Sequence, residues 1–225
     1  MMQNEGDMTW KDISIDTSDG ALLSGLWVQP ADAQAVIVLV SVTSEGLHSA
    51  TNQLLAETLA RAGYASLFTD LLTAHEHRED AELADLRYDI GLLTTRLSNV
   101  IDWGRKEIPD APVGILAAST GAAAALSVAA ERSDEVAAVV SRGGRPDLAG
   151  DTLRATHTPT LLLLGGEDSP LVDLNREAAA WLRGEYRLEI IPGASGFSGN
   201  NPSHVEELAR RAGEWFATYL VSESS

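Results

Sequence analysis

The chain has 225 residues, a formal net charge of −17 and no cysteine. The lack of cysteine excludes disulfides, thiolate metal sites and a cysteine nucleophile, and it is typical of a reducing compartment, so we expect a cytoplasmic protein. The negative charge disfavours nucleic acids and anionic membranes as partners. No apolar run approaches the ~20 residues of a membrane-spanning helix, and the polar N-terminal segment does not have the form of a signal peptide.

Short apolar runs alternate with longer helical patterns along the chain. The first two runs, Thr9–Thr17 and Ala21–Gln29, flank a Ser-Asp-Gly turn and predict an antiparallel hairpin. The next run, Ala35–Val42, is continuously apolar and predicts a strand buried on both faces. The elements predicted after it are a helix near Ala50–Ala62, a strand at Tyr64–Leu72, a long helix around Ala84–Lys106, and a strand at Val113–Ser119 that leads directly into a helix.

The second half of the chain continues the alternation. It predicts strands at Val136–Ser141, Thr160–Gly165 and Arg187–Ile191, a helix near Leu171–Leu182, and a closing helix at Pro202–Tyr219. A hairpin followed by repeated strand–helix units predicts an α/β fold, with a mostly parallel sheet and helices on both faces. No internal repeat or linker-like segment divides the chain, so we expect one domain over residues 1–225.

The strongest functional signal is the segment Ala117–Gly121, in which Ser119 stands between a buried strand and a stretch of small residues. Small residues on both sides of a serine at a strand-to-helix turn are typical of a nucleophile elbow. Ligands of open α/β sheets bind beyond the carboxyl ends of the strands, where this serine lies. We therefore expect Ser119 to be a nucleophile and the N–H of Thr120 to be an oxyanion donor. The alternative is a serine that caps the helix.

Asp168 follows the strand Thr160–Gly165 and is predicted at the same edge of the sheet as Ser119. An acid at this place, after the nucleophile in chain order, is positioned to orient a catalytic histidine. The alternative role is N-cap of the helix that follows, which has Pro170 near its first turn. Its acidic neighbours, Glu167 and Asp173, are rivals for the acid role.

Five segments together resemble the dienelactone hydrolase-like branch of the α/β-hydrolases. They are Tyr88–Leu93, Ala118–Ala123, Val140–Asp147, Gly165–Asp168 and Ile191–Ala194. The resemblance implies an α/β-hydrolase fold of about eight strands and hydrolysis of esters or lactones by a nucleophile–His–Asp triad. It gives the nucleophile role to Ser119 and the acid role to Asp168. We expect no cofactor and no metal, and a small ester-like molecule as substrate or inhibitor.

Two segments depart from this family pattern. Members of the family carry the general base in a Pro-Gly-Ala-x-His loop, and in this chain the histidine position is occupied by Gly196. The strand that ends near Val40 usually leads into a His-Gly oxyanion loop, but here Ser41 and Val42 follow it. We expect the N–H of Thr43 to be the second oxyanion donor.

Other histidines are candidates for the missing base. His48 follows the third predicted strand and His204 lies early in the last helix, so both are expected at the edge of Ser119. His75 and His77 follow the next strand at this edge and have the spacing of a surface chelate, but no third ligand stands at a fixed distance from them. For each histidine the alternative is a solvated or capping side chain.

The departures from the family pattern lie only in the predicted site, whereas the rest of the chain matches that pattern. This distribution favours a remodelled pocket over a general loss of the family's sequence features. We expect a hydrolase scaffold whose active site has been altered, as in an engineered or designed variant. Its function is predicted to be weak or single-turnover acyl transfer, of the esterase or lactonase type, at Ser119. The alternative is an inactive version of the fold that binds a small molecule. Thr73–Leu86 and Gly196–Asn201 are predicted to frame the mouth of the pocket.

Overall fold

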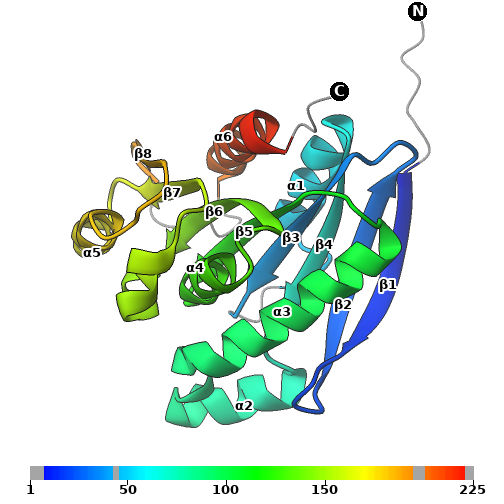
Figure 1. The fold of residues 1–225 in the computed structure, drawn as a ribbon, viewed down its shortest axis with the longest axis horizontal. Coiled ribbons are helices and arrows are strands. Elements are labelled where there is room, and N and C mark those ends of the chain that lie inside the picture. The colour runs from blue at the N-terminus through cyan, green and yellow to red at the C-terminus, as the bar shows by residue number, and fades with distance from the viewer. Residues whose placement is uncertain (1–7, 43–45, 195–200, 221–225) are drawn as a thin grey trace, which may run out of the picture.

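The fold is built on an eight-stranded sheet with the order β1-β2-β4-β3-β5-β6-β7-β8 (Figure 1). The computed structural model describes residues 8–42, 46–194 and 201–220. The strands are β1 (Met8–Asp16), β2 (Leu22–Pro30), β3 (Ala35–Ser41), β4 (Tyr64–Asp70), β5 (Val113–Ser119), β6 (Val136–Gly144), β7 (Thr160–Gly165) and β8 (Tyr186–Ile191). β2 pairs antiparallel with β1 and with β4, and the remaining pairs are parallel. The predicted hairpin and mostly parallel sheet are confirmed.

Helices cover both faces of this sheet. They are α1 (Ala50–Arg61), α2 (Ala74–Leu83), α3 (Ile90–Glu107), α4 (Gly121–Glu131), α5 (Ser169–Ala179) and α6 (Pro202–Tyr219), with 3-10 segments η1 (Leu86–Tyr88) and η2 (Pro146–Ala155). α1 and α6 pack against one face, whereas α3 and α4 pack against the other (Figure 1). In the part of the chain that the structure describes, no helix has the length and apolarity to cross a membrane.

The central strand β3 shows how the sequence pattern builds two cores. Val36, Val38 and Val40 belong to the core beneath α3 and α4, whereas Ile37 and Leu39 belong to the core beneath α1 and α6. Successive side chains of a strand point to opposite faces, so a strand covered on both faces needs an uninterrupted apolar run. The prediction that this strand is buried on both faces is confirmed.

The helix predicted over Ala84–Lys106 begins later than expected, and a helix that the sequence did not predict precedes it, so this part of the chain contains two helices. The first of them, α2, ends where Ala84 adopts a left-handed conformation with φ of 54°, which terminates helices. The second, α3, begins at Ile90, and the side chain of Asp89 accepts a hydrogen bond from the N–H of Leu92. The predicted start was wrong because α2 and the break after it have no apolar periodicity.

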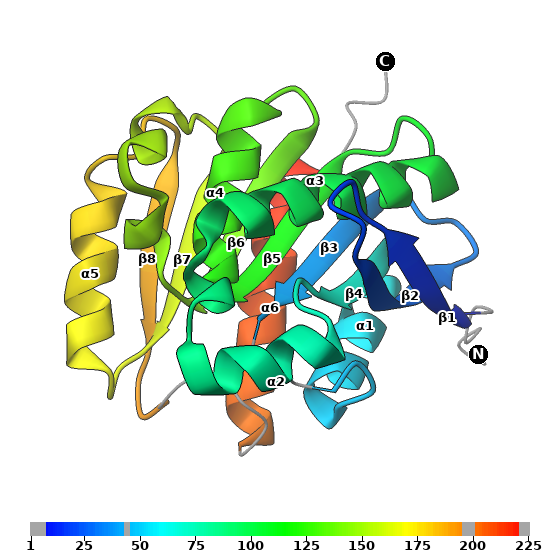
Figure 2. The same ribbon diagram turned by 90° about the horizontal axis from the view of Figure 1, so that it is seen from below.

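α2 buries little of its surface and is fixed by polar contacts of its first turn. Thr73 Oγ1 accepts a hydrogen bond from the N–H of Glu76 at 3.2 Å, and the Glu76 carboxylate accepts one from the N–H of Thr73 at 2.7 Å. This reciprocal capping box satisfies two amides that a helix start leaves without partners. α2 lies near the carboxyl ends of the central strands (Figure 2), so the segment predicted to frame a pocket mouth contains a helix at this edge.

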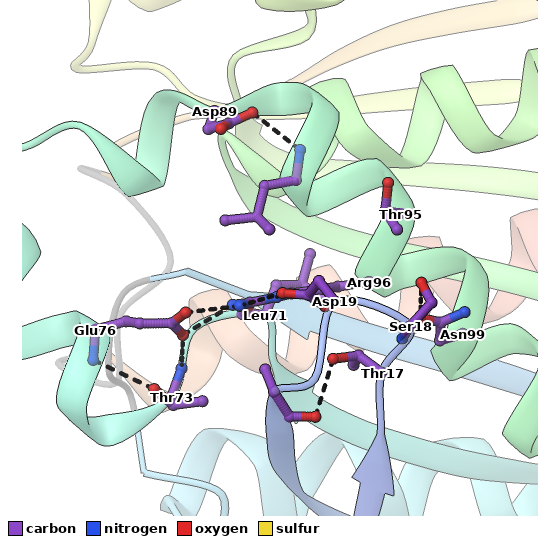
Figure 3. A network of polar contacts seen from close by, with 12 residues as sticks. Thr17, Ser18, Asp19, Leu71, Thr73, Glu76, Asp89, Thr95, Arg96 and Asn99 are labelled. Carbon is purple, nitrogen blue, oxygen red and sulfur yellow. Dashed lines mark hydrogen bonds and ion pairs between the residues drawn. The ribbon is translucent and has the colours of Figure 1, made fainter.

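Arg96 joins α2 to α3 and to the turn between β1 and β2 (Figure 3). Its side chain is 2% exposed and donates hydrogen bonds to Asp19 at 2.8 Å, to Glu76 at 2.6 Å and to the carbonyl of Leu71 at 2.8 Å. The hydrogen bond from Arg96 lowers the pKa of Glu76 to about 2, because it favours the ionised carboxylate. A lowered acidic pKa stabilises the fold above the unfolded-state value of 4.5, and this stabilisation is lost as the pH falls toward 2.

Candidate active site

Ser119 ends β5 in a left-handed backbone conformation, with φ of 54°. This conformation costs an L-residue about 1–2 kcal/mol. α4 begins two residues later, so the chain turns sharply from strand to helix at this serine. The N-cap position of α4 belongs to Thr120 and not to Ser119, so the alternative of a capping serine does not describe this turn. A strained serine between a buried strand and a helix has the geometry of a nucleophile elbow.

The neighbouring strand β6 braces this elbow. The β5–β6 pairing shifts after Ala118, so that Ser119 pairs with Gly144 and Gly143 is left out of the register. Gly143 has φ of 53°, which glycine adopts without the steric cost of a Cβ atom. The N–H of Arg145 then donates a hydrogen bond to the carbonyl of Ser119 at 2.9 Å. The bulge therefore holds the end of β6 against the backbone of the elbow.

Small residues allow α4 to begin close to both strands. Ala122 and the three alanines that follow it are fully buried. A Cβ atom added to Gly144 would lie 2.4 Å from Cβ of Ala122 and 2.3 Å from Oγ of Ser141. Contacts this short do not occur between packed atoms, so glycine is the residue that fits beside the elbow.

The strain at Ser119 predicts an unusual order of stability between two variants. Ser119→Gly removes the Cβ atom that disfavours φ of 54°, whereas Ser119→Ala keeps it. We expect the glycine variant to be about 1 kcal/mol more stable than the alanine variant in urea denaturation. Ala117→Gly, in the regular part of β5, is the control and should destabilise the fold. A glycine variant no more stable than the alanine variant would contradict a strained elbow.

The start of α4 supplies hydrogen-bond donors at the same edge. The first amides of a helix have no acceptors within it, and the helix dipole is positive at this end, so a developing anion is stabilised there. Thr120, the predicted oxyanion donor, lies at this position. Thr43, the predicted second donor, lies outside the described residues.

Asp168 lies on the loop after β7, at the carboxyl edge that also holds Ser119. Its side chain is exposed, and Oδ1 accepts a hydrogen bond from the N–H of Leu171 at 3.2 Å as the N-cap of α5. The capping alternative is therefore the contact that this side chain makes. The role of Asp168 as a triad acid stays a prediction.

The loop after β7 is tied to the loop after β8. The N–H of Gly166 donates to the carbonyl of Ile191 at 3.0 Å, and the N–H of Glu167 donates to the carbonyl of Ala194 at 3.2 Å. Gly196, the residue predicted to stand at the family's histidine position, is two residues farther along the chain and lies outside the described residues. The loop that precedes this position thus begins beside the loop of Asp168.

His48 is paired at the far side of the sheet. Its Nε2 lies 2.9 Å from Oδ1 of Asp12 in β1, and both side chains are exposed. The strands β2, β4 and β3 separate β1 from β5, which at ~4.8 Å per strand amounts to about 19 Å. The structure therefore does not bring His48 together with Ser119.

His204 lies in the first turn of α6, with its Nε2 3.4 Å from Nδ2 of Asn201. α6 begins at the carboxyl edge of the sheet (Figure 2), so His204 and Ser119 share this edge. Its role as a general base stays a prediction.

His77 has a partner that the sequence did not reveal. Its Nε2 lies 2.9 Å from Oδ2 of Asp70 at the end of β4, and the two side chains are 17% and 16% exposed. The atoms are close enough for an ion pair but not aligned as a hydrogen bond. His77 was expected at this edge; its partner was missed because no helix was predicted there. No group of three or more metal-ligating side chains occurs within the described ranges.

The fold has counterparts in known hydrolases. The model of the dienelactone hydrolase family matches residues 23–220. A dienelactone hydrolase from Anabaena variabilis is 39% identical, covers 95% of this chain and 99% of its own, and superposes with a TM-score of 0.87. Est1E from Butyrivibrio proteoclasticus is 14% identical, with a TM-score of 0.74 over 92% of this chain and 98% of its own, and shows a similar fold.

Relatives in two strains of Mycobacterium tuberculosis are each 40% identical over 200 residues, or 88% of this chain. Their names describe each as a phosphoribosyl transferase, and this chain spans only 44% of their length. The family match, in contrast, extends over nearly the whole of the chain. Together with the strand order and the strained turn at Ser119, it places the chain: it belongs to the dienelactone hydrolase family.

Proposed function

We propose that this chain is a serine hydrolase scaffold that transfers acyl groups from small esters to Ser119 and has an incomplete catalytic triad. The observation that carries the proposal is the left-handed Ser119 at the carboxyl end of β5. Membership of the dienelactone hydrolase family supports the reaction class. Est1E shares the fold at low identity and adds no more than that.

In the proposed reaction, Ser119 Oγ attacks the carbonyl carbon of the ester and loses its proton to a base. The tetrahedral intermediate places its negative oxygen at the start of α4, where the N–H of Thr120 donates to it. The N–H of Thr43 is the proposed second donor. The alcohol then leaves with a proton, and an acyl group remains on Ser119.

The proposed weakness of this site is its base. Gly196 occupies the family's histidine position, and glycine has no side chain that accepts a proton. Of the histidines that the sequence offers, His204 is favoured over His48, because His204 lies at the edge of Ser119 and His48 is paired with Asp12. Asp168 is the proposed acid that orients the base. Without an efficient base, the water that releases the acyl group is not activated, and the acyl-enzyme accumulates.

A fluorophosphonate probe and a p-nitrophenyl ester test this proposal together. We expect the probe to label Ser119, and the ester to release about one equivalent of nitrophenol per chain, followed by slow turnover. Ser119→Ala should abolish both signals. Ser169→Ala is the matched control, because Ser169 is an exposed serine at the same edge and should leave both signals unchanged. Steady turnover that survives Ser119→Ala would contradict the proposal.

The second proposed function is binding of a small molecule without turnover. The glycine at position 196 favours it, since the family's base is the group that catalysis most needs. Saturable binding of an ester, without labelling and without a burst, would support this function over the first. Both proposals apply to a natural chain and to an engineered pocket alike.

A further inference from the structure

Asn175 is a fully buried amide on α5, with 0% exposure. Its Nδ2 donates hydrogen bonds to the carbonyl of Gly144 at 3.0 Å and to the carbonyl of Leu171 at 2.9 Å. Both partners are acceptors, so the amide nitrogen and not the oxygen must face them. The two contacts fix how this side chain is oriented.

The first contact reaches the residue opposite the elbow. The pairing of β6 with β7 ends at Arg142 and Leu163, so Gly144 extends beyond the reach of β7. Its carbonyl accepts from Asn175 instead. Gly144 is in turn the register partner of Ser119, and the next N–H along the chain donates to the carbonyl of Ser119 at 2.9 Å. Asn175 therefore holds the segment that braces the serine.

The second contact reaches the first turn of α5. Leu171 accepts from Asn175 through its carbonyl and donates through its N–H to Oδ1 of Asp168 at 3.2 Å. One side-chain amide thus connects the loop after β7, which carries Asp168, with the elbow after β5. These are the two loops that hold the proposed acid and the proposed nucleophile.

Stability alone does not account for an amide at this position. Asn175 Oδ1 is buried and has no hydrogen-bond partner among the described residues. A buried polar atom without a partner costs about 1–3 kcal/mol. An apolar side chain of similar size would avoid this cost. The amide therefore makes its two contacts at the expense of some stability of the fold.

We propose that Asn175 is a positioning residue, which sets the placement of Ser119 for acyl transfer by tying the start of α5 to Gly144. This inference rests on the proposed function. Reacting groups held out of place by about 1 Å lose about 100-fold in rate. Loosening the brace is therefore expected to slow the reaction of Ser119 more than it lowers the stability of the fold.

The test compares Asn175→Leu, Asn175→Ser and Thr158→Val. Leucine keeps the branching and the number of heavy atoms of the side chain and removes both contacts. Serine is the second variant, because its hydroxyl can donate to the carbonyl four residues earlier in the helix but cannot reach Gly144. Thr158 is buried at the opposite end of the sheet, where its hydroxyl donates to the carbonyl of Ala129 at 3.4 Å. Its valine variant controls for the loss of a buried hydrogen bond.

Two quantities are measured at a temperature at which all three variants are folded. The rate of fluorophosphonate labelling at Ser119 is expected to fall about 10- to 100-fold in both Asn175 variants and less than about twofold in the Thr158 variant. Amide exchange at Arg145, whose N–H donates to Ser119, is expected to accelerate in the Asn175 variants only. This second readout reports the brace without requiring reactivity.

The outcomes separate this inference from the function on which it rests. If the unsubstituted chain is not labelled, the proposed function fails and the positioning role fails with it. If that chain is labelled and the Asn175 variants match it in labelling rate and in Arg145 exchange, the inference alone is overturned. An equal loss of labelling in the Thr158 variant also overturns it, because the effect would then be general destabilisation.

Discussion

Replacement of Arg96 by methionine is expected to lower the free energy of unfolding by about 3–5 kcal/mol, measured by urea denaturation at neutral pH. The guanidinium is 2% exposed and pairs with Asp19 and Glu76. Methionine fills the space of the side-chain stem but leaves these two carboxylates without their cation. Both carboxylates are partly buried, and a partly buried charge that has lost its partner costs more than an exposed ion pair contributes.

The control for this loss is Arg61→Met. Arg61 pairs with Glu57 four residues earlier in α1, and both side chains are well exposed, so its loss should cost less than about 0.5 kcal/mol. The Arg96 variant should also lose part of the acid dependence of stability that comes from Glu76, because the lowered pKa of about 2 depends first on the hydrogen bond with Arg96 and then on those with Thr73. Equal stability of the two variants would show that the network does not anchor α2.

The sheet could be predicted from the sequence because burial on both faces leaves a local signal. β7 is buried at every position, its four central residues are leucines, and its bounds match the predicted strand Thr160–Gly165. α2 left no such signal, since its stabilising contacts are made by polar side chains. Glu76 pairs with Arg96, which lies 20 residues farther along the chain. No local sequence pattern indicates a partner at that distance.

The candidate site likewise contains features that the sequence predicted and features that it did not. The flanking small residues predicted the turn at Ser119, because packing of α4 against β5 and β6 demands them locally. The two roles considered for Asp168 could not be separated, since a helix cap and a catalytic acid both need a carboxylate after a strand. His48 was expected near the serine because it follows β3, and β3 does lie next to β5. Its side chain instead lies against Asp12 in β1, a contact between distant residues that no local pattern in the sequence indicates.

Gly196→His is expected to have the largest effect on activity. It places an imidazole at the position that we propose to correspond to the family's general base. Removal of a triad member costs a serine hydrolase about 10⁴- to 10⁶-fold in rate. A histidine on a loop that is not otherwise adapted to hold it should recover part of this loss. We expect steady-state turnover of a p-nitrophenyl ester to rise about 10²- to 10⁴-fold.

Two further variants make this result specific. Gly196→Ala changes the backbone freedom of the loop without adding an imidazole, so it should leave turnover near the level of the unsubstituted chain. Gly196→His combined with Ser119→Ala should abolish the gain, since an imidazole that activates the serine has no effect without it. The gain should also have the pH dependence of a histidine, with activity rising as the imidazole loses its proton near pH 6.5.

The structure gives a reason to expect this gain from a single substitution. The loop that leads to position 196 is already held beside the loop of Asp168 by the hydrogen bond from the N–H of Glu167 to the carbonyl of Ala194 at 3.2 Å. Asp168 is exposed and its Oδ1 caps α5, so its second carboxylate oxygen is the one offered to a histidine. If turnover does not rise in the Gly196→His variant while Ser119 is still labelled by the probe, the serine is reactive but position 196 is not the place of its base. His204 would then be the first residue to replace.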